Sequence, residues 1–146
     1  MRLNLHTDQL ANHRDFYEGE RYGINPTFKI VAGDTIVDLS YEYADHERFI
    51  DRGIPTVNNR PVESLKDVVF GVEALNIQTL DASILRANIA HDYSGNGKFN
   101  MSFTSSDFKK MYKNLYAAGY DASANTVKLD GYLDPTERLN MILNAN

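Results

Sequence analysis

The sequence contains no cysteine and no tryptophan, and only four of its 146 residues are proline. The absence of cysteine excludes a disulfide framework, thiol catalysis and a cysteine-type zinc site. No window holds the roughly 18 successive apolar residues that a membrane-spanning helix needs. Residues 1–20 lack an apolar core segment and a small-residue cleavage site, so we expect no signal peptide.

Positive charge is also scarce. Lysine and arginine together number 15, against 20 aspartate and glutamate residues, which gives a formal net charge of -5. Surfaces that bind nucleic acid usually carry a basic stripe, so we expect no nucleic acid as a partner. The length is typical of one domain, and no repeat, low-complexity tract or linker divides the chain. We therefore treat residues 1–146 as a single unit.

Apolar residues recur mainly with a period of two, which is the spacing of a β-strand with one apolar face. The clearest run, residues 34–45, places Val37, Leu39, Tyr41 and Tyr43 on one face. Helical spacing is limited to two possible segments, residues 62–72 and 107–118. The alternation predicts an all-β fold, an antiparallel meander of about six strands. The other alternating runs are residues 2–8, 21–30, 83–93, 98–106 and 138–143.

Turn signals separate these runs unevenly. Ala32-Gly33-Asp34 and Ser94-Gly95-Asn96-Gly97 each join two strands tightly, and Asn-Gly is a strong hairpin signal. The connections at the opposite ends are longer and cover residues 11–20, 46–79 and 117–126. Long loops are usually functional or disordered. We therefore expect short turns on one side of the sheet and long loops on the other, with the 46–79 loop facing outward.

Two architectures use strands with one apolar and one polar face. A soluble sandwich or lipocalin-like barrel buries the apolar face, whereas an outer-membrane barrel turns that face toward lipid. The asymmetry between short turns and long loops favours the membrane barrel. Tyr22, Tyr41, Tyr43 and Tyr93 lie near strand ends, where an aromatic girdle would sit. Aromatic residues are also common in soluble sheets, so the pattern alone leaves both architectures open.

Three segments carry a resemblance to a known family. Residues 20–27 read Glu-Arg-Tyr-Gly-Ile-Asn-Pro-Thr, residues 37–43 read Val-Asp-Leu-Ser-Tyr-Glu-Tyr, and residues 51–55 read Asp-Arg-Gly-Ile-Pro. In this order they resemble TonB-dependent ferric-siderophore receptors of the outer membrane of Gram-negative bacteria. Residues 83–93, 98–116 and 127–143 look like the strands that follow. The resemblance therefore covers nearly the whole chain.

The resemblance implies a part of a barrel of about 22 strands with a plugged lumen. Such receptors bind a ferric siderophore on the outer side and import it with energy from the inner-membrane TonB complex. This sequence shows no plug domain, no TonB-contacting box and no aromatic C-terminal residue. About eight strands are needed to close a barrel in lipid. We therefore expect an excised central segment that does not transport alone.

The same reading implies particular partners. The ferric siderophore and the TonB complex would be partners of the full-length parent receptor, in the outer membrane. Lipid or detergent would cover the apolar face. The two unpaired edge strands would favour self-association. Soluble ligand-binding barrels and purely structural β-rich modules remain the alternatives.

Ligand contact in such a receptor would come from the outer loops and the upper lumen. Arginine presents a planar charged fork that suits catecholate or carboxylate oxygens, and aromatic rings supply flat apolar contact. The alternative is that Arg52 pairs with Asp51, Asp45 or Glu47 to brace its own loop, while the tyrosines form an interfacial girdle. The predicted ligand-binding residues are Arg48, Phe49, Arg52, Arg60, Tyr112, Tyr116 and Tyr120.

The sequence predicts neither an enzyme nor a protein-bound metal or cofactor. His46 lies between Asp45 and Glu47, but no second nitrogen ligand stands at a set spacing. His91 and Asp92 are neighbours on a predicted strand, so their side chains point to opposite faces and form no relay. A siderophore chelates its iron fully, so the resemblance implies no protein ligand for the metal.

Overall fold

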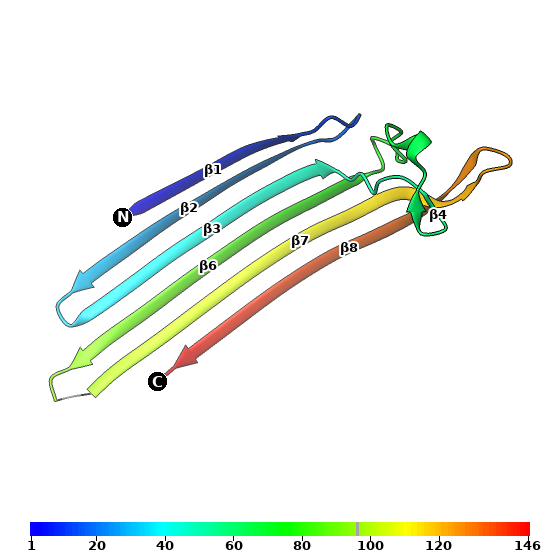
Figure 1. Cartoon of the computed structure of the whole chain (residues 1–146). Coiled ribbons are helices and arrows are strands. Elements are labelled where there is room, and N and C mark those ends of the chain that lie inside the picture. The colour runs from blue at the N-terminus through cyan, green and yellow to red at the C-terminus, as the bar shows by residue number, and fades with distance from the viewer. Residues whose placement is uncertain (96) are drawn as a thin grey trace.

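The computed structural model describes every residue except Asn96, and its main feature is one curved antiparallel sheet of six strands, beside a small two-stranded sheet in the longest loop (Figure 1). The strand order is β1-β2-β3-β6-β7-β8, so each strand lies beside its neighbour in sequence. This confirms the predicted all-β meander of six strands. The strands are β1 (Arg2–Ala11), β2 (Glu18–Ala32), β3 (Thr35–Phe49), β6 (Ile77–Tyr93), β7 (Gly97–Asp121) and β8 (Thr126–Ala145).

The two longest connections lie at one end of the sheet, as the sequence predicts, but the third connection at that end is a turn of only four residues. Residues 12–17 join β1 to β2, residues 50–76 join β3 to β6, and residues 122–125 join β7 to β8. The longest of these contains β4 (Thr56–Val57), β5 (Arg60–Pro61) and the 3₁₀ helix η1 (Glu63–Leu65). At the opposite end Gly33 turns β2 into β3 with φ of 59°. The predicted turn residue Asn96 lies outside the described residues.

The strands extend further toward the loop end than the alternation predicts. Residues 107–118, a possible helix by spacing, belong to β7, and residues 62–72 contain only the single turn η1. Phe108, Met111 and Leu115 have helical spacing because β7 carries apolar side chains on both faces in this region. The expected loops 46–79, 11–20 and 117–126 shorten accordingly. No helix in the described residues is long and apolar enough to cross a membrane.

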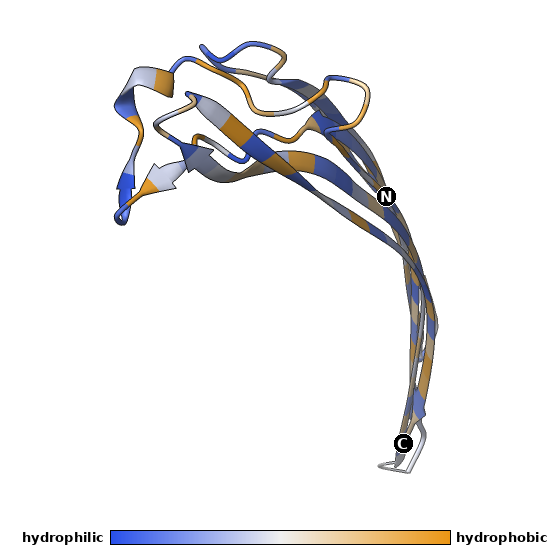
Figure 2. Ribbon diagram, turned by 90° about the vertical axis from the view of Figure 1, so that its right-hand side faces the viewer, coloured by the Kyte–Doolittle hydropathy of each residue, from blue (hydrophilic) through white to orange (hydrophobic). Residues whose placement is uncertain are grey.

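The register divides the sheet into two unlike faces, because side chains of directly paired residues point to the same side. Figure 2 shows the resulting alternation of hydrophobic and hydrophilic residues along the strands. The apolar face carries Leu3, Leu5, Ile24, Phe28, Ile30, Val37, Leu39, Tyr41, Leu85, Ala87, Ile89, Phe99, Met101, Phe103, Leu139, Met141 and Leu143. The polar face carries Asn4, Asn25, Thr27, Ser40, Glu42, Arg86, Asn88, Ser102, Thr104, Asn140 and Asn144.

Pro26 interrupts the sheet at an interior strand. Proline has no backbone N–H to give to a ladder, and β2 lies between β1 and β3. The pairing of β2 with β3 accordingly stops after Ile24 and resumes at Thr27. The Asn25 side-chain amide donates to the carbonyl of Tyr41 at 2.9 Å, where the register places Pro26. A side chain thus supplies the donor that the proline lacks.

The described residues bury little apolar surface, and what they bury lies mainly at the loop end. Phe49 and Ile50, at 5% and 6% exposure, are buried where β3 meets its loop, and Ala82 is buried in β6. Asn76 and Asn114 are the most buried polar side chains. The sheet has no second layer over its apolar face, so most of that face is accessible (Figure 2).

Replacing Asn25 with alanine should destabilise the sheet by about 1–2 kcal/mol, because it removes the bond to the Tyr41 carbonyl and the bond that Asn25 accepts from Asn4 at 3.1 Å. The loss should be smaller in a Pro26→Thr background, because threonine restores a backbone N–H. Urea unfolding in detergent, followed by circular dichroism, measures both. Asn88→Ala is the matched control, since Asn88 lies exposed on the same face. An equal loss of stability in both backgrounds would contradict the conclusion that the Asn25 side chain replaces the backbone donor that Pro26 lacks.

Candidate functional site

The candidate site lies at the loop end of the polar face. The side chains that form it are Arg52 from the long loop, Tyr112, Asn114 and Tyr116 from β7, and Tyr132 from β8. The three β7 residues alternate along one strand and therefore share a face. The position of Arg52 depends on how residues 50–76 are held against the sheet. Two anchors hold that loop.

The first anchor is an ion pair between two loops. Arg14, in the β1–β2 connection, binds Asp51 at the start of the long loop, and their side chains are only 15% and 7% exposed. The Arg14 guanidinium also donates to the carbonyls of Lys66 and Val68, the latter at 2.9 Å. Asp51 in turn accepts the backbone N–H of Gly53 at 2.8 Å. One arginine thus ties the beginning and the middle of the long loop together.

The second anchor is Asn76, which is fully buried at the end of the loop. Its side-chain nitrogen donates to the carbonyls of Ile50 and Leu115, at 2.9 and 2.8 Å. Its side-chain oxygen accepts the N–H groups of Val72 and Leu115, at 3.1 and 3.0 Å. All four bonding positions of the amide are used. Towards Leu115 the side chain acts as a strand backbone does, because it both gives and accepts a hydrogen bond.

With the loop held this way, Arg52 lies over Tyr116. The Arg52 guanidinium carbon is 4.9 Å from the ring centroid, which is cation–π geometry. Gly53 follows with φ of 80°, a left-handed conformation that glycine adopts without strain, so the chain turns sharply after the arginine. Arg52 is exposed, so the edge of its guanidinium is accessible to an anionic oxygen.

The other aromatic pair of the site joins the last two strands. The rings of Tyr112 and Tyr132 meet edge to face, 5.9 Å apart with an interplanar angle of 73°. Asn114 stands directly opposite Tyr132 and is 2% exposed. Neither its side-chain nitrogen nor its oxygen finds a partner among the described residues. The site therefore combines a guanidinium fork with flat aromatic surface, a set suited to a flat anionic ligand, above the buried amide of Asn114.

The structure brings together only some of the residues predicted from the sequence. Arg52, Tyr116 and Tyr112 gather at the site. Arg48 instead binds Gln78 through two bonds of 3.0 and 2.7 Å, and Phe49 is buried against Phe16. Arg60 is exposed in β5, and Tyr120 donates to Asn125 in the β7–β8 turn at 2.9 Å. Asp51 pairs with Arg14, and none of the ion pairs among the described residues includes Arg52, so the alternative in which Arg52 pairs with Asp51, Asp45 or Glu47 does not hold.

The β7–β8 turn has its own polar framework. Asp121 accepts hydrogen bonds from the Ser123 hydroxyl and from the backbone N–H groups of Ser123 and Ala124. These bonds, led by the Ser123 hydroxyl, lower the pKa of the Asp121 carboxyl. Asn125 completes the turn with φ of 50°. Tyr120 therefore belongs to a turn, away from Arg52.

Sequence reasoning missed Arg14, Asn76, Asn114 and Tyr132. Arg14 and Asn76 act over separations of more than 35 residues, and no local pattern marks such contacts.

In the residues that the structure describes, no group of three histidine, aspartate or glutamate side chains is placed to hold a metal ion. Comparison of the chain with protein-family models, with curated proteins and with solved structures gave no significant match.

Replacing Asn76 with alanine should release the long loop and destabilise the protein by about 3 kcal/mol or more, because it removes four hydrogen bonds of a fully buried amide, two of them to the N–H and carbonyl of Leu115. Limited proteolysis within residues 50–76 and amide exchange at Leu115 report the release. Asn114→Ala is the matched control, since Asn114 is equally buried but unbonded to the described residues. A similar loss in both variants would show that burial, and not bonding, holds the loop.

Proposed function

We propose that this chain is a wall segment of a β-barrel that crosses a lipid bilayer, with its apolar face toward lipid and its polar face toward an aqueous lumen. The observation that carries this is the apolar band, which extends from edge strand β1 to edge strand β8 and leaves large apolar side chains exposed on both edges. Leu5, Leu139, Met141 and Leu143 on those edges are 72%, 63%, 68% and 66% exposed. A soluble lipocalin-like barrel would need these side chains buried.

The dimensions of the band fit a bilayer. On the apolar face, β2 is apolar or aromatic at every alternate position from Tyr22 to Ala32. Ten steps at about 3.3 Å each give roughly 33 Å along the strand. At the usual barrel tilt of about 40°, this corresponds to a height of roughly 25 Å, which is the height of the lipid-facing band of such barrels.

The band ends at one level across the sheet. Asp45, Asp81, Lys109 and Glu137 stand in a single row of paired residues on the apolar face. Asp107 lies one row closer to the band, beside Ser83. Tyr22 and Tyr43, whose rings are 6.3 Å apart, mark the same level on β2 and β3. A row of charges beside tyrosines is the arrangement expected at a membrane–water boundary.

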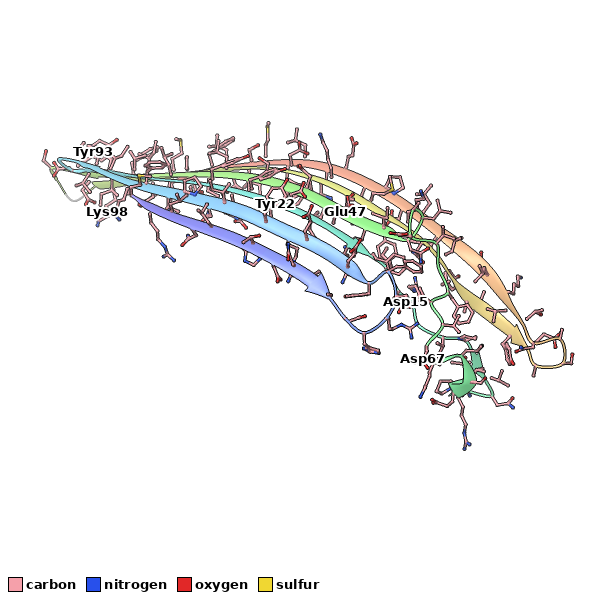
Figure 3. All side chains as sticks on the ribbon, turned by 90° about the horizontal axis from the view of Figure 1, so that it is seen from above. Asp15, Tyr22, Glu47, Asp67, Tyr93 and Lys98 are labelled. Atoms are coloured by element: carbon pink, nitrogen blue, oxygen red, sulfur yellow. The ribbon has the colours of Figure 1, made fainter. Side chains whose placement is uncertain are left out.

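Aromatic side chains also mark the opposite boundary, near the short turns. Tyr93 and Lys98 lie at that end, whereas Asp15 and Asp67 lie in the loops at the other (Figure 3). The rings of His91 and Tyr93 meet edge to face at 4.6 Å. Phe99, paired with His91, extends this aromatic group onto β7. An aromatic group at each boundary of the apolar band supports the same interpretation.

We further propose that the parent barrel is an outer-membrane receptor that binds a ferric siderophore and imports it with TonB-derived energy. Two observations support this: the resemblance of residues 20–27, 37–43 and 51–55, and the exposed Arg52 guanidinium stacked on Tyr116. The Asp-Arg-Gly-Ile-Pro segment that carries the resemblance is also the segment that positions Arg52. The isolated chain would bind without transporting.

The membrane orientation predicts opposite responses to arginine on the two faces. Leu85→Arg, on the apolar face of β6, should reduce folding into liposomes by about 2–4 kcal/mol, the cost of arginine near the bilayer midplane. Asn88→Arg, on the polar face of the same strand, should have little effect. Urea titration of the liposome-inserted chain measures both. Equal tolerance of the two substitutions would contradict an apolar face turned toward lipid.

Ligand binding should depend on the stacked pair. Titration with ferric catecholates and ferric hydroxamates should quench tyrosine fluorescence, and Arg52→Ala or Tyr116→Ala should weaken binding about tenfold, the value of one charge-assisted contact. Arg2→Ala, at the far end of the sheet, is the control. Quenching that is unchanged in Arg52→Ala would place the ligand elsewhere or argue against a siderophore.

A further inference from the structure

A cavity of about 750 Å³ lies at the loop end on the side of the apolar face, opposite the candidate site. Two neighbouring rows of strand residues form its floor: Gln9, Glu20 and Glu47 in one, and Ala11, Glu18, Phe49 and Ile77 in the next. Phe16 from the first loop and residues 73–74 from the long loop close its sides. Its volume falls within the roughly 300–1,000 Å³ of small-molecule sites.

An aromatic pair lines this cavity. The rings of Phe16 and Phe49 are 6.2 Å apart and tilted by 52°. Phe49 is buried, whereas Phe16 remains half exposed at the mouth. Phe16 also has φ of 63°, a left-handed conformation that costs a bulky residue free energy and is held by a bond from the Glu18 N–H to the Phe16 carbonyl at 2.9 Å. The Phe16 ring therefore lies at the mouth of the cavity only because the backbone adopts a strained conformation at this residue.

Carboxylates that form no ion pair surround the aromatic floor of the cavity. Glu18, Glu20, Glu47 and Glu73 all line the cavity, and none forms an ion pair within the part of the chain that the structure describes. Glu20 and Glu47 are direct cross-strand partners, and like charges in that position repel. Arg48 also lines the cavity, but its guanidinium is bonded to Gln78 on the polar face and forms no ion pair with these carboxylates.

We infer that this cavity binds an organic cation with an apolar or aromatic body, such as an amphipathic ammonium compound. The ammonium group would relieve the repulsion between Glu20 and Glu47 and lie against the faces of Phe16 and Phe49. The apolar body would cover Ile77 and Ala74. The carboxylates are too dispersed to hold a metal ion, since the described residues contain no cluster of three ligands. This inference stands independently of the proposed membrane function.

The cavity and the candidate site therefore differ in sign. Arg52 presents positive charge on the polar face, whereas the cavity presents four carboxylates on the other. An anionic ligand of the first site would be repelled from the second. The two sites can be tested with separate probes and separate variants.

The test is isothermal titration of the whole chain, folded in a non-ionic detergent, with benzyltrimethylammonium. Neutral benzyl alcohol and anionic phenylacetate serve as size-matched comparisons. We expect the cation to bind at least about tenfold more tightly than either, and the double variant Glu20→Gln with Glu47→Gln to remove about tenfold of that affinity. Phe16→Ala should weaken binding as well. Glu63→Gln, in η1, is the control and should change nothing.

Glutamine substitutions also guard against misfolding as an explanation, because they remove repulsion without changing side-chain size. The double variant should unfold at the same or a higher urea concentration than the native chain when no probe is present. Native chain alone should then gain stability on adding the cation. Equal binding of benzyl alcohol, unchanged affinity in the double variant, or absence of any binding would each overturn the inference.

Discussion

The register of the antiparallel ladder is the constraint on which everything else depends. Side chains alternate with a period of two, so a slip of one residue between any two strands would exchange the faces of all the strands beyond it. The pairing of β3, β6 and β7 runs without a break over their shared length. At Pro26 the ladder loses a donor, yet the register on either side is unchanged. That continuity creates one apolar band, one charged row and two separate ligand-sized surfaces.

The fold was largely predictable because the signals that define it, apolar alternation and turn residues, lie within short segments of the sequence. Alternation over residues 34–45 identifies β3 and its apolar face, and Gly33 identifies the turn before it. Prediction failed where a strand carries apolar side chains on both of its faces. In β7, Phe108 and Tyr112 face one side while Met111 and Leu115 face the other, so the alternation disappears and helical spacing arises by coincidence. The strands also extend beyond their alternating runs at the loop end, where charged residues such as those at 45–48 continue β3.

The candidate site was only partly predictable, for a different reason. Residue type points to Arg52 and Tyr116, because arginine and tyrosine are suited to anionic aromatic ligands. Which arginine is free, however, depends on long-range partners. Gln78 binds Arg48, and Asp51 is bound by Arg14 from another loop. Asn76 resembles any other asparagine in the sequence, although in the structure its amide completes the end of a strand ladder.

Completing the ladder in that way has a mechanical consequence. The last backbone partner of β7 on the β6 side is Ile77, opposite Lys113, and the Asn76 amide extends the contact to Leu115. Further along, β7 has only β8 as a strand neighbour, with an irregularity between Ala117 and Gly119. A six-stranded sheet resists bending, whereas a two-stranded ribbon is compliant. The part of this hairpin beyond Asn76 is therefore free to bend relative to the rest of the sheet. Tyr116 lies next to the point where that bending begins.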